Sequence, residues 1–300
     1  MKVRSLLLFT CISLGVLMLA KAALAQDIPQ GDAIRGGQLY DNWFVILDLE
    51  PPQGDHPLWQ TQQSNTRSGS VTWRCSTCHG WDYKGKDGAY GPQSPQYTGF
   101  PGISSMVGLS NNEILAALDG TNNPDHNFSE LINNHALVDI IAFLRTKQVD
   151  IALIIDYEDN TALGREETGR DVYGDYCIEC HGFDGSALNF DTAGTPEFIG
   201  DLALENPWKF IHRVRFGRPL SEFHAFENVG LSLQNITDAL TYSQTLPPAD
   251  PMAGKIDPLS DDQFLNVVGQ GELNAIILAA AGIVLVIIVG LAWTTYKSKT

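Results

Sequence analysis

Apolar residues recur three or four positions apart in several short segments, which is the spacing of one face of an α-helix. Two such segments are at matching places in the two halves of the chain: Leu137, Ile140, Ile141 and Leu144, and then Leu233, Ile236 and Leu240. Ser232 precedes the second segment as a helix cap. Both segments predict a helix, and an aromatic residue, Phe143 or Tyr242, lies at the same place in each.

Two further helices are predicted from their end signals. Ser110 with Glu113 forms a capping box ahead of Ile114, and Gly120 marks the end of that helix. In the second half, Asn206 and Pro207 give a cap and a first-turn proline, and Gly217 is the stop. The stretch between residues 80 and 102 is dense in glycine and proline and predicts loop rather than long helix.

Two short cysteine motifs dominate the chemistry of the chain. Cys75-Ser-Thr-Cys78-His79 is followed by a glycine, and Cys177-Ile-Glu-Cys180-His181 is followed by one as well. C-x-x-C-H is the pattern of c-type haem attachment. Two thiols at this spacing can reach the two vinyl groups of one haem, and the adjacent histidine can ligate the iron. The sequence therefore predicts two covalently attached haem c groups, with His79 and His181 as proximal ligands.

Other interpretations of these motifs explain less. A zinc site with four cysteine ligands leaves both histidines without a role and needs unusually distant ligand pairs. A thioredoxin-like redox pair needs a βαβ pattern, which neither motif has around it. The fifth cysteine, Cys11, lies in an apolar N-terminal segment that is expected to be removed.

The two halves share landmarks that indicate a repeated unit. Gly36 and Tyr40 form a G-x-x-x-Y pattern in the first half, and Gly169 and Tyr173 form it in the second. In the second half the haem motif follows almost at once. In the first half an insertion, about residues 44–72 and rich in Pro, Gly and Gln, comes between them.

These landmarks resemble those of class I cytochrome c domains, and the pair is similar in arrangement to diheme cytochromes of the c4 type. The resemblance covers about residues 30–248. It implies a mostly α fold in which the first and last helices of each domain cross. Gly36 or Gly37 would then meet Phe143, and Gly169 would meet Tyr242. The domain limits that follow are 26–150 for the first domain and 151–248 for the second.

The chain departs from that family at the sixth iron ligand. A class I domain usually has a methionine just before its last helix, but only Met106 and Met252 lie beyond the N-terminal segment, one early and one late for this role. The expected places contain His126 and His224, each in an H-x-F sequence. We therefore expect His126 and His224 as distal ligands, with the two methionines as the less favoured alternative.

The ends of the chain indicate export and anchoring. Residues 1–25 have a positive start, an apolar run and an A-x-A site, as a cleaved signal peptide does. Residues 273–294 are apolar and long enough to span a bilayer, after a linker at 249–272 and before a short tail at 295–300 with Lys297 and Lys299. This predicts a single-pass inner-membrane protein with both haem domains in the periplasm and the tail in the cytoplasm.

The formal net charge of −16 and the lack of a basic stripe argue against nucleic acid as a partner. Two histidine ligands on each iron leave no open position for substrate, which favours an electron carrier between redox proteins, or a subunit of a membrane oxidoreductase complex. The alternative is a haem enzyme, either a peroxidase or a thiosulfate dehydrogenase-like protein. The latter uses a distal cysteine in its family, and no cysteine is left over for that role here. A haem-based sensor would need a cytoplasmic domain, for which residues 295–300 are too few.

Overall fold

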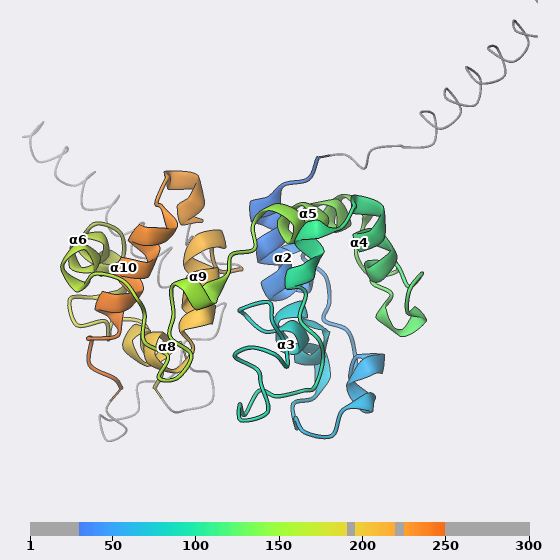
Figure 1. The fold of residues 1–300 in the computed structure, drawn as a ribbon, viewed down its shortest axis with the longest axis horizontal. Helices are drawn as coiled ribbons and strands as arrows, with labels where there is room; N and C mark the ends of the chain where they lie inside the picture. Colours follow the sequence, from blue (N-terminus) through green and yellow to red (C-terminus); the bar gives the residue numbers. More distant parts are fainter. Residues whose placement is uncertain (1–29, 191–195, 220–224, 250–300) are drawn as a thin grey trace, which may run out of the picture.

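The computed structural model describes residues 30–190, 196–219 and 225–249. Its regular elements in these ranges are α-helices and short 3-10 helices (η), arranged in two lobes (Figure 1). The first lobe contains α2 (Ala33–Ile46), η1 (Pro57–Thr61), η2 (Gly69–Trp73), α3 (Cys75–His79), η3 (Ser104–Gly108), α4 (Asn111–Leu118), η4 (Pro124–His126) and α5 (Asn134–Thr146). The second contains η5 (Ile151–Leu153), α6 (Glu166–Tyr176), α7 (Ile178–His181), α8 (Ile199–Glu205), α9 (Pro207–Phe216), η6 (Phe226–Val229) and α10 (Leu233–Ser243).

The predicted helix starts are confirmed. Ser110 caps α4 and forms the capping box with Glu113. The side chain of Asn206 accepts a hydrogen bond from the backbone of α9, whose first residue is Pro207. Ser232 caps α10 in the same way. The mostly helical class is therefore correct for the described residues.

The crossing of first and last helices in each lobe is also confirmed. A Cβ atom on Gly36 would lie 2.0 Å from the backbone oxygen of Asp139 and 2.7 Å from Cβ of Phe143, so α2 meets α5 there. A Cβ on Gly169 would lie 1.9 Å from the backbone oxygen of Asp238 and 2.9 Å from Cβ of Tyr242. Only glycine allows helices to approach this closely, which explains both G-x-x-x-Y patterns.

A buried carboxylate holds each helix pair at equivalent positions. Asp139 accepts a hydrogen bond from the backbone N–H of Asp32 at 2.7 Å and pairs with Arg35. Asp238 accepts one from the backbone N–H of Arg165 at 2.8 Å and pairs with the guanidinium of the same residue at 3.1 Å. Because these side chains are almost fully buried, each carboxylate needs such partners to offset its desolvation. The repeat therefore extends to polar contacts that the sequence pattern alone did not indicate.

Helix α6 offers a matched test of the helix crossing. Gly169→Ala is expected to force α6 and α10 apart and to lower the free energy of unfolding by several kcal/mol, of the order seen for overpacked cores. Gly174→Ala, in the same helix, places its Cβ in open space and is expected to raise stability by about 0.5–1 kcal/mol. Denaturant unfolding of both variants measures the difference, and equal effects would contradict the close contact.

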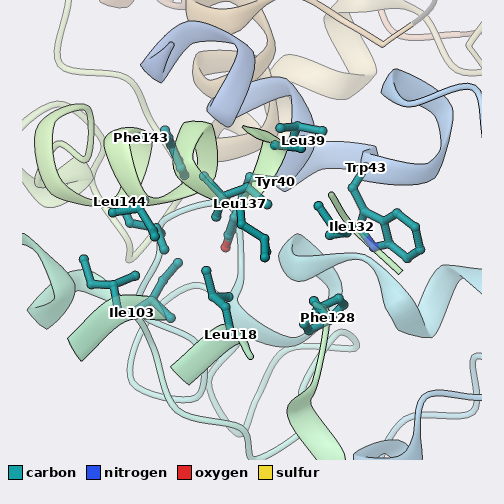
Figure 2. Close-up of a cluster of buried hydrophobic side chains, with 14 of the residues drawn as sticks. Leu39, Tyr40, Trp43, Ile103, Leu118, Phe128, Ile132, Leu137, Phe143 and Leu144 are labelled. Atoms are coloured by element: carbon teal, nitrogen blue, oxygen red, sulfur yellow. The ribbon is translucent and has the colours of Figure 1, made fainter. Parts of the chain in front are cut away.

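The core of the first lobe lies between α2, α4 and α5 (Figure 2). Leu39, Tyr40 and Trp43 enter it from α2, and Leu137 and Phe143 enter it from α5. Phe216, the last residue of α9, belongs to the same core although it comes from the second lobe. The two lobes therefore share buried contacts instead of being joined only by their linking chain.

The expected transmembrane helix requires a correction. The longest described helix, α2, has 14 residues, whereas a bilayer needs about 20. Within residues 30–190, 196–219 and 225–249, no helix is long and apolar enough to cross a membrane. The fold class expected from the sequence is thus not supported in this part. The ranges behind that expectation, 273–294 and the tail, lie outside the described residues, as do the signal segment 1–25 and most of the linker 249–272.

Candidate haem site

The first C-x-x-C-H motif opens onto an apolar cavity of about 380 Å³. Cys75, Cys78 and His79 form one wall of it, and His126 lies in its lining as well. Core residues close the remaining sides: Tyr40, Ile103, Ile114, Leu118, Phe128, Ile140 and Leu144. A volume of this size falls in the usual range for a cofactor pocket.

The motif forms a single helical turn, α3, which ends at Gly80. Gly80 has φ of 75°, a conformation that residues with a side chain rarely adopt. The hydroxyl of Tyr40 donates to the backbone oxygen of Gly80 at 2.6 Å. In the second lobe, Gly182 has φ of 77°, and the hydroxyl of Tyr173 donates to its backbone oxygen at 2.8 Å. The glycine after each motif and the tyrosine of each G-x-x-x-Y pattern therefore position the turn that the motif forms.

His79 and His126 have their rings fixed in the same way. Nδ1 of His79 lies 2.8 Å from the backbone oxygen of Pro101, and Nδ1 of His126 lies 2.7 Å from that of Ala117. A carbonyl can only accept, so each neutral ring carries its proton on Nδ1. That tautomer leaves Nε2 with a free lone pair, as a metal ligand requires.

The distance between these rings fits an iron held between them. Their centroids lie 6.2 Å apart, with the ring planes at 79°. A bond from a metal to a histidine nitrogen is about 2 Å long, so two such bonds and the path from each nitrogen to its ring centre span roughly 6 Å. The pair expected from the sequence, His79 with His126, is therefore brought together, and the residues present fit a haem.

The environment keeps the histidines and thiols uncharged. Burial lowers the pKa of His79 to about 4 and also lowers the pKa of His126. Burial raises the pKa values of the Cys75 and Cys78 thiols to about 12. A redox-active cysteine pair needs a lowered pKa, so these thiols are unsuited to disulfide exchange. The raised pKa values therefore argue against redox chemistry at these two sulfur atoms.

The second motif itself is described, but the histidine expected opposite it is not. Cys177 and His181 are buried, and Nδ1 of His181 has no hydrogen-bond partner among the described residues. Burial lowers the pKa of His181 to about 4, and Phe190 packs against its ring. Cys180 is exposed at the surface of the second lobe. The two motifs lie in separate cores, so their four cysteines do not form one group.

Not all candidate distal ligands can be placed. His224 and Met252 lie outside the described residues. Met106 belongs to η3 and borders the first cavity, where it packs against the core. Met106 and His126 therefore both reach the first cavity, and the ring separation that fits an iron is that of His126 with His79.

The insertion before the first motif covers the cavity. The helix α2 continues to Ile46, so the irregular part begins about three residues later than expected from the sequence. His56, Leu58, Thr72 and Trp73 from this segment line the cavity. His56 is buried. It also makes a local turn contact, because its Nδ1 accepts a hydrogen bond from the backbone N–H of Leu58 at 3.2 Å.

The second lobe is bound to the first site through a buried ion cluster. Asp41 on α2 is fully buried and pairs with Arg74, which directly precedes Cys75, and with Arg213 of α9 at 2.9 Å. Burial raises the pKa of the Asp41 carboxyl, but the charges of Arg213 and Arg74 outweigh it and hold this pKa well below its usual range. The residue before the first motif and the second lobe thus share one carboxylate.

His212 on α9 is a second buried link between the lobes. Its Nε2 lies 2.9 Å from the backbone oxygen of Gly37, and its Nδ1 lies 2.8 Å from the hydroxyl of Tyr83. Since the Gly37 oxygen must accept, Nε2 carries the proton and Nδ1 accepts from Tyr83. Burial lowers the pKa of His212 to about 4 from an ordinary value of 6.5.

This contact predicts an acid-sensitive interface. Above pH 6.5 the ring is neutral in the folded and unfolded states, so its contribution to stability is complete. Between pH 6.5 and 4 the unfolded state binds the proton more readily, and stability falls by on the order of 3 kcal/mol. His212→Gln keeps one donor and one acceptor and does not titrate, so its stability is expected to fall less over this range. If the free energy of unfolding changed equally with pH in the two proteins, the assignment to His212 would be contradicted.

Sequence reasoning missed His56, Arg74, Asp41 and Arg213 as parts of the site. Asp41 directly follows the tyrosine of the G-x-x-x-Y pattern, and Arg74 directly precedes the first cysteine. His212 and Arg213 lie between the apolar residues Ile211 and Val214 on α9, which is the signal that could have indicated burial. Nothing in the insertion marked His56, because its role depends on how that segment folds back.

Comparisons with known proteins add no family to this description: no family model, no curated protein and no solved structure matches the chain.

Proposed function

We propose that this chain is a diheme c-type cytochrome that carries electrons between redox proteins in the periplasm. The observation that supports this most is the pair of rings of His79 and His126, 6.2 Å apart across an apolar cavity that Cys75 and Cys78 also line. Cys75 and Cys78 would hold the first haem covalently, and Cys177 and Cys180 the second. His79 and His181 would be the proximal ligands, and His126 and His224 the distal ones.

When bound, each haem would supply one-electron redox chemistry, and the protein would set its ligation and surroundings. Two histidine ligands would keep the potential of each haem below that of a histidine–methionine site. Tyr40 and the backbone oxygens of Pro101 and Ala117 fix the turn and both rings, so little rearrangement is needed when the charge of the iron changes. These features suit a carrier better than an enzyme, which needs an open iron position.

The contact between the lobes supports a two-site carrier. Asp41, Arg213 and His212 join α9 to the first lobe, and Phe216 of α9 packs edge-on against Phe143 at 5.3 Å. These buried contacts would hold the two haems at a constant separation. Fixed separation favours direct electron transfer from one haem to the other. The acidic surface would steer basic redox partners toward the protein, since the formal net charge is −16.

A potentiometric titration of the holoprotein tests this function. The account expects two one-electron steps, full reduction by a small redox protein, and no turnover of hydrogen peroxide or thiosulfate. Catalytic oxidation or reduction of either compound would contradict the carrier and would favour the haem-enzyme alternative. The matched control is His135→Ala, which removes an exposed histidine and is expected to leave both steps unchanged.

A further inference from the structure

His56 is a third histidine in the first cavity, and no role has yet been given to its side chain there. Its ring centroid lies 5.9 Å from that of His126, and the ring is only 5% exposed. Trp73 packs against it at 4.6 Å and Phe128 at 5.5 Å. This aromatic enclosure keeps the imidazole beside His126 instead of in solvent.

We propose that His56 is a reserve distal ligand of the first haem site, which takes the sixth position on the iron when His126 leaves it. This inference rests on the proposed haem. It gives the insertion a function: the segment brings a second histidine to the side of the cavity where His126 lies. The purpose would be to keep the iron six-coordinate and closed to small ligands.

The hydrogen bonds set the order of the two histidines. His126 already carries its proton on Nδ1, so its Nε2 lone pair is free. Nδ1 of His56 accepts from the backbone N–H of Leu58, so the proton of the neutral ring is on Nε2. Ligation by His56 through Nε2 therefore requires a change of tautomer and the loss of this capping bond. His126 is the resting ligand for that reason, and His56 binds only in its absence.

The exchange balances without any electron transfer. The bond between the iron and Nε2 of His126 breaks, and a bond to Nε2 of His56 forms. The proton that leaves Nε2 of His56 returns to its Nδ1 through solvent. The segment that must move contains only short 3-10 helices, η1 and η2, on either side of an irregular stretch, so the shift breaks no α-helix.

The test is the spin state of the ferric holoprotein with His126→Ala, measured by electron paramagnetic resonance. The second haem gives a constant background. The proposal expects that the first haem of this variant stays low-spin with two nitrogen ligands. A double variant, His126→Ala with His56→Asn, is expected to gain high-spin signal equal to one haem per protein. Asn is chosen because it keeps an N-cap acceptor for Leu58.

A high-spin first haem in His126→Ala alone would overturn the proposal. That result would leave the proposed carrier function intact, provided that the unchanged protein has two bis-histidine haems. If the first haem of the unchanged protein lacked two histidine ligands, the proposed function itself would be overturned. If His126→Ala does not fold, His126→Leu, which keeps an apolar side chain in the cavity, takes its place in the same spin-state measurement, with and without His56→Asn. A high-spin first haem in His126→Leu alone would overturn the proposal in the same way, and His135→Ala serves as the control.

Discussion

Replacing Cys75 and Cys78 together by alanine is expected to leave the protein with one covalent haem instead of two. These thiols line the first cavity beside His79 and have no other described role. Loss of the covalent bonds also leaves an apolar cavity of about 380 Å³ without its cofactor, so the first lobe is expected to lose much of its stability. Mass spectrometry of the denatured protein counts the haems that remain attached.

The second motif supplies the matched control for this experiment. Cys177→Ala with Cys180→Ala is expected to remove the other haem and to leave His79 and His126 on the first. The visible absorption spectra of the two double variants should therefore add up to the spectrum of the unchanged protein. A variant pair that loses both haems or neither would contradict two independent attachment sites.

The second large effect is expected from Asp41→Asn. The change keeps the shape of the side chain but leaves Arg74 and Arg213 without their shared negative charge in a buried place. Breaking a buried ion pair by removing one partner costs about 3–5 kcal/mol. The loss should appear in denaturant unfolding of the holoprotein, and it should affect both lobes because the cluster joins them.

An exposed ion pair serves as the comparison. Glu166 and Arg170 face solvent one turn apart on α6, with side chains 53% and 61% exposed. Glu166→Gln is expected to change stability by less than about 0.5 kcal/mol, since solvent screens such pairs. If Asp41→Asn cost no more than this, the cluster would not be what fastens α9 to the first lobe.

Much of the first lobe and its site could be predicted because the signals are local. Capping boxes, the C-x-x-C-H motif and a glycine facing an aromatic each lie within a few residues or repeat in both halves. The pairing of His79 with His126 could be predicted from the repeated H-x-F sequence. In class I cytochrome c domains, which the chain resembles, the distal ligand comes just before the last helix, and H-x-F occupies that place here. The structure supports that placement in the first lobe with the ring geometry.

The contacts between the lobes could not be predicted, because they depend on how the two halves dock. Nothing near His212 in the sequence indicates that its partners are Gly37 and Tyr83, which lie well over a hundred residues earlier. Trp81 and Tyr83 closely follow the first motif in the sequence, but both make contacts to the second lobe. Tyr83 donates a hydrogen bond to His212, and Trp81 packs in the core of the second lobe. Helix α8 was also not predicted, because its seven residues are too few to show a clear helical spacing of apolar positions.

The central claim is bis-histidine ligation of two covalently bound haems, and low-temperature electron paramagnetic resonance combined with near-infrared magnetic circular dichroism tests it most directly. Bis-histidine and histidine–methionine haems have their charge-transfer bands at different energies. The account predicts that the oxidised holoprotein shows only the bis-histidine band and no high-spin signal, which would exclude Met106 as a ligand. A histidine–methionine band, or a high-spin haem, would contradict the assignment of His126 or His224 and would reopen the case for an enzyme.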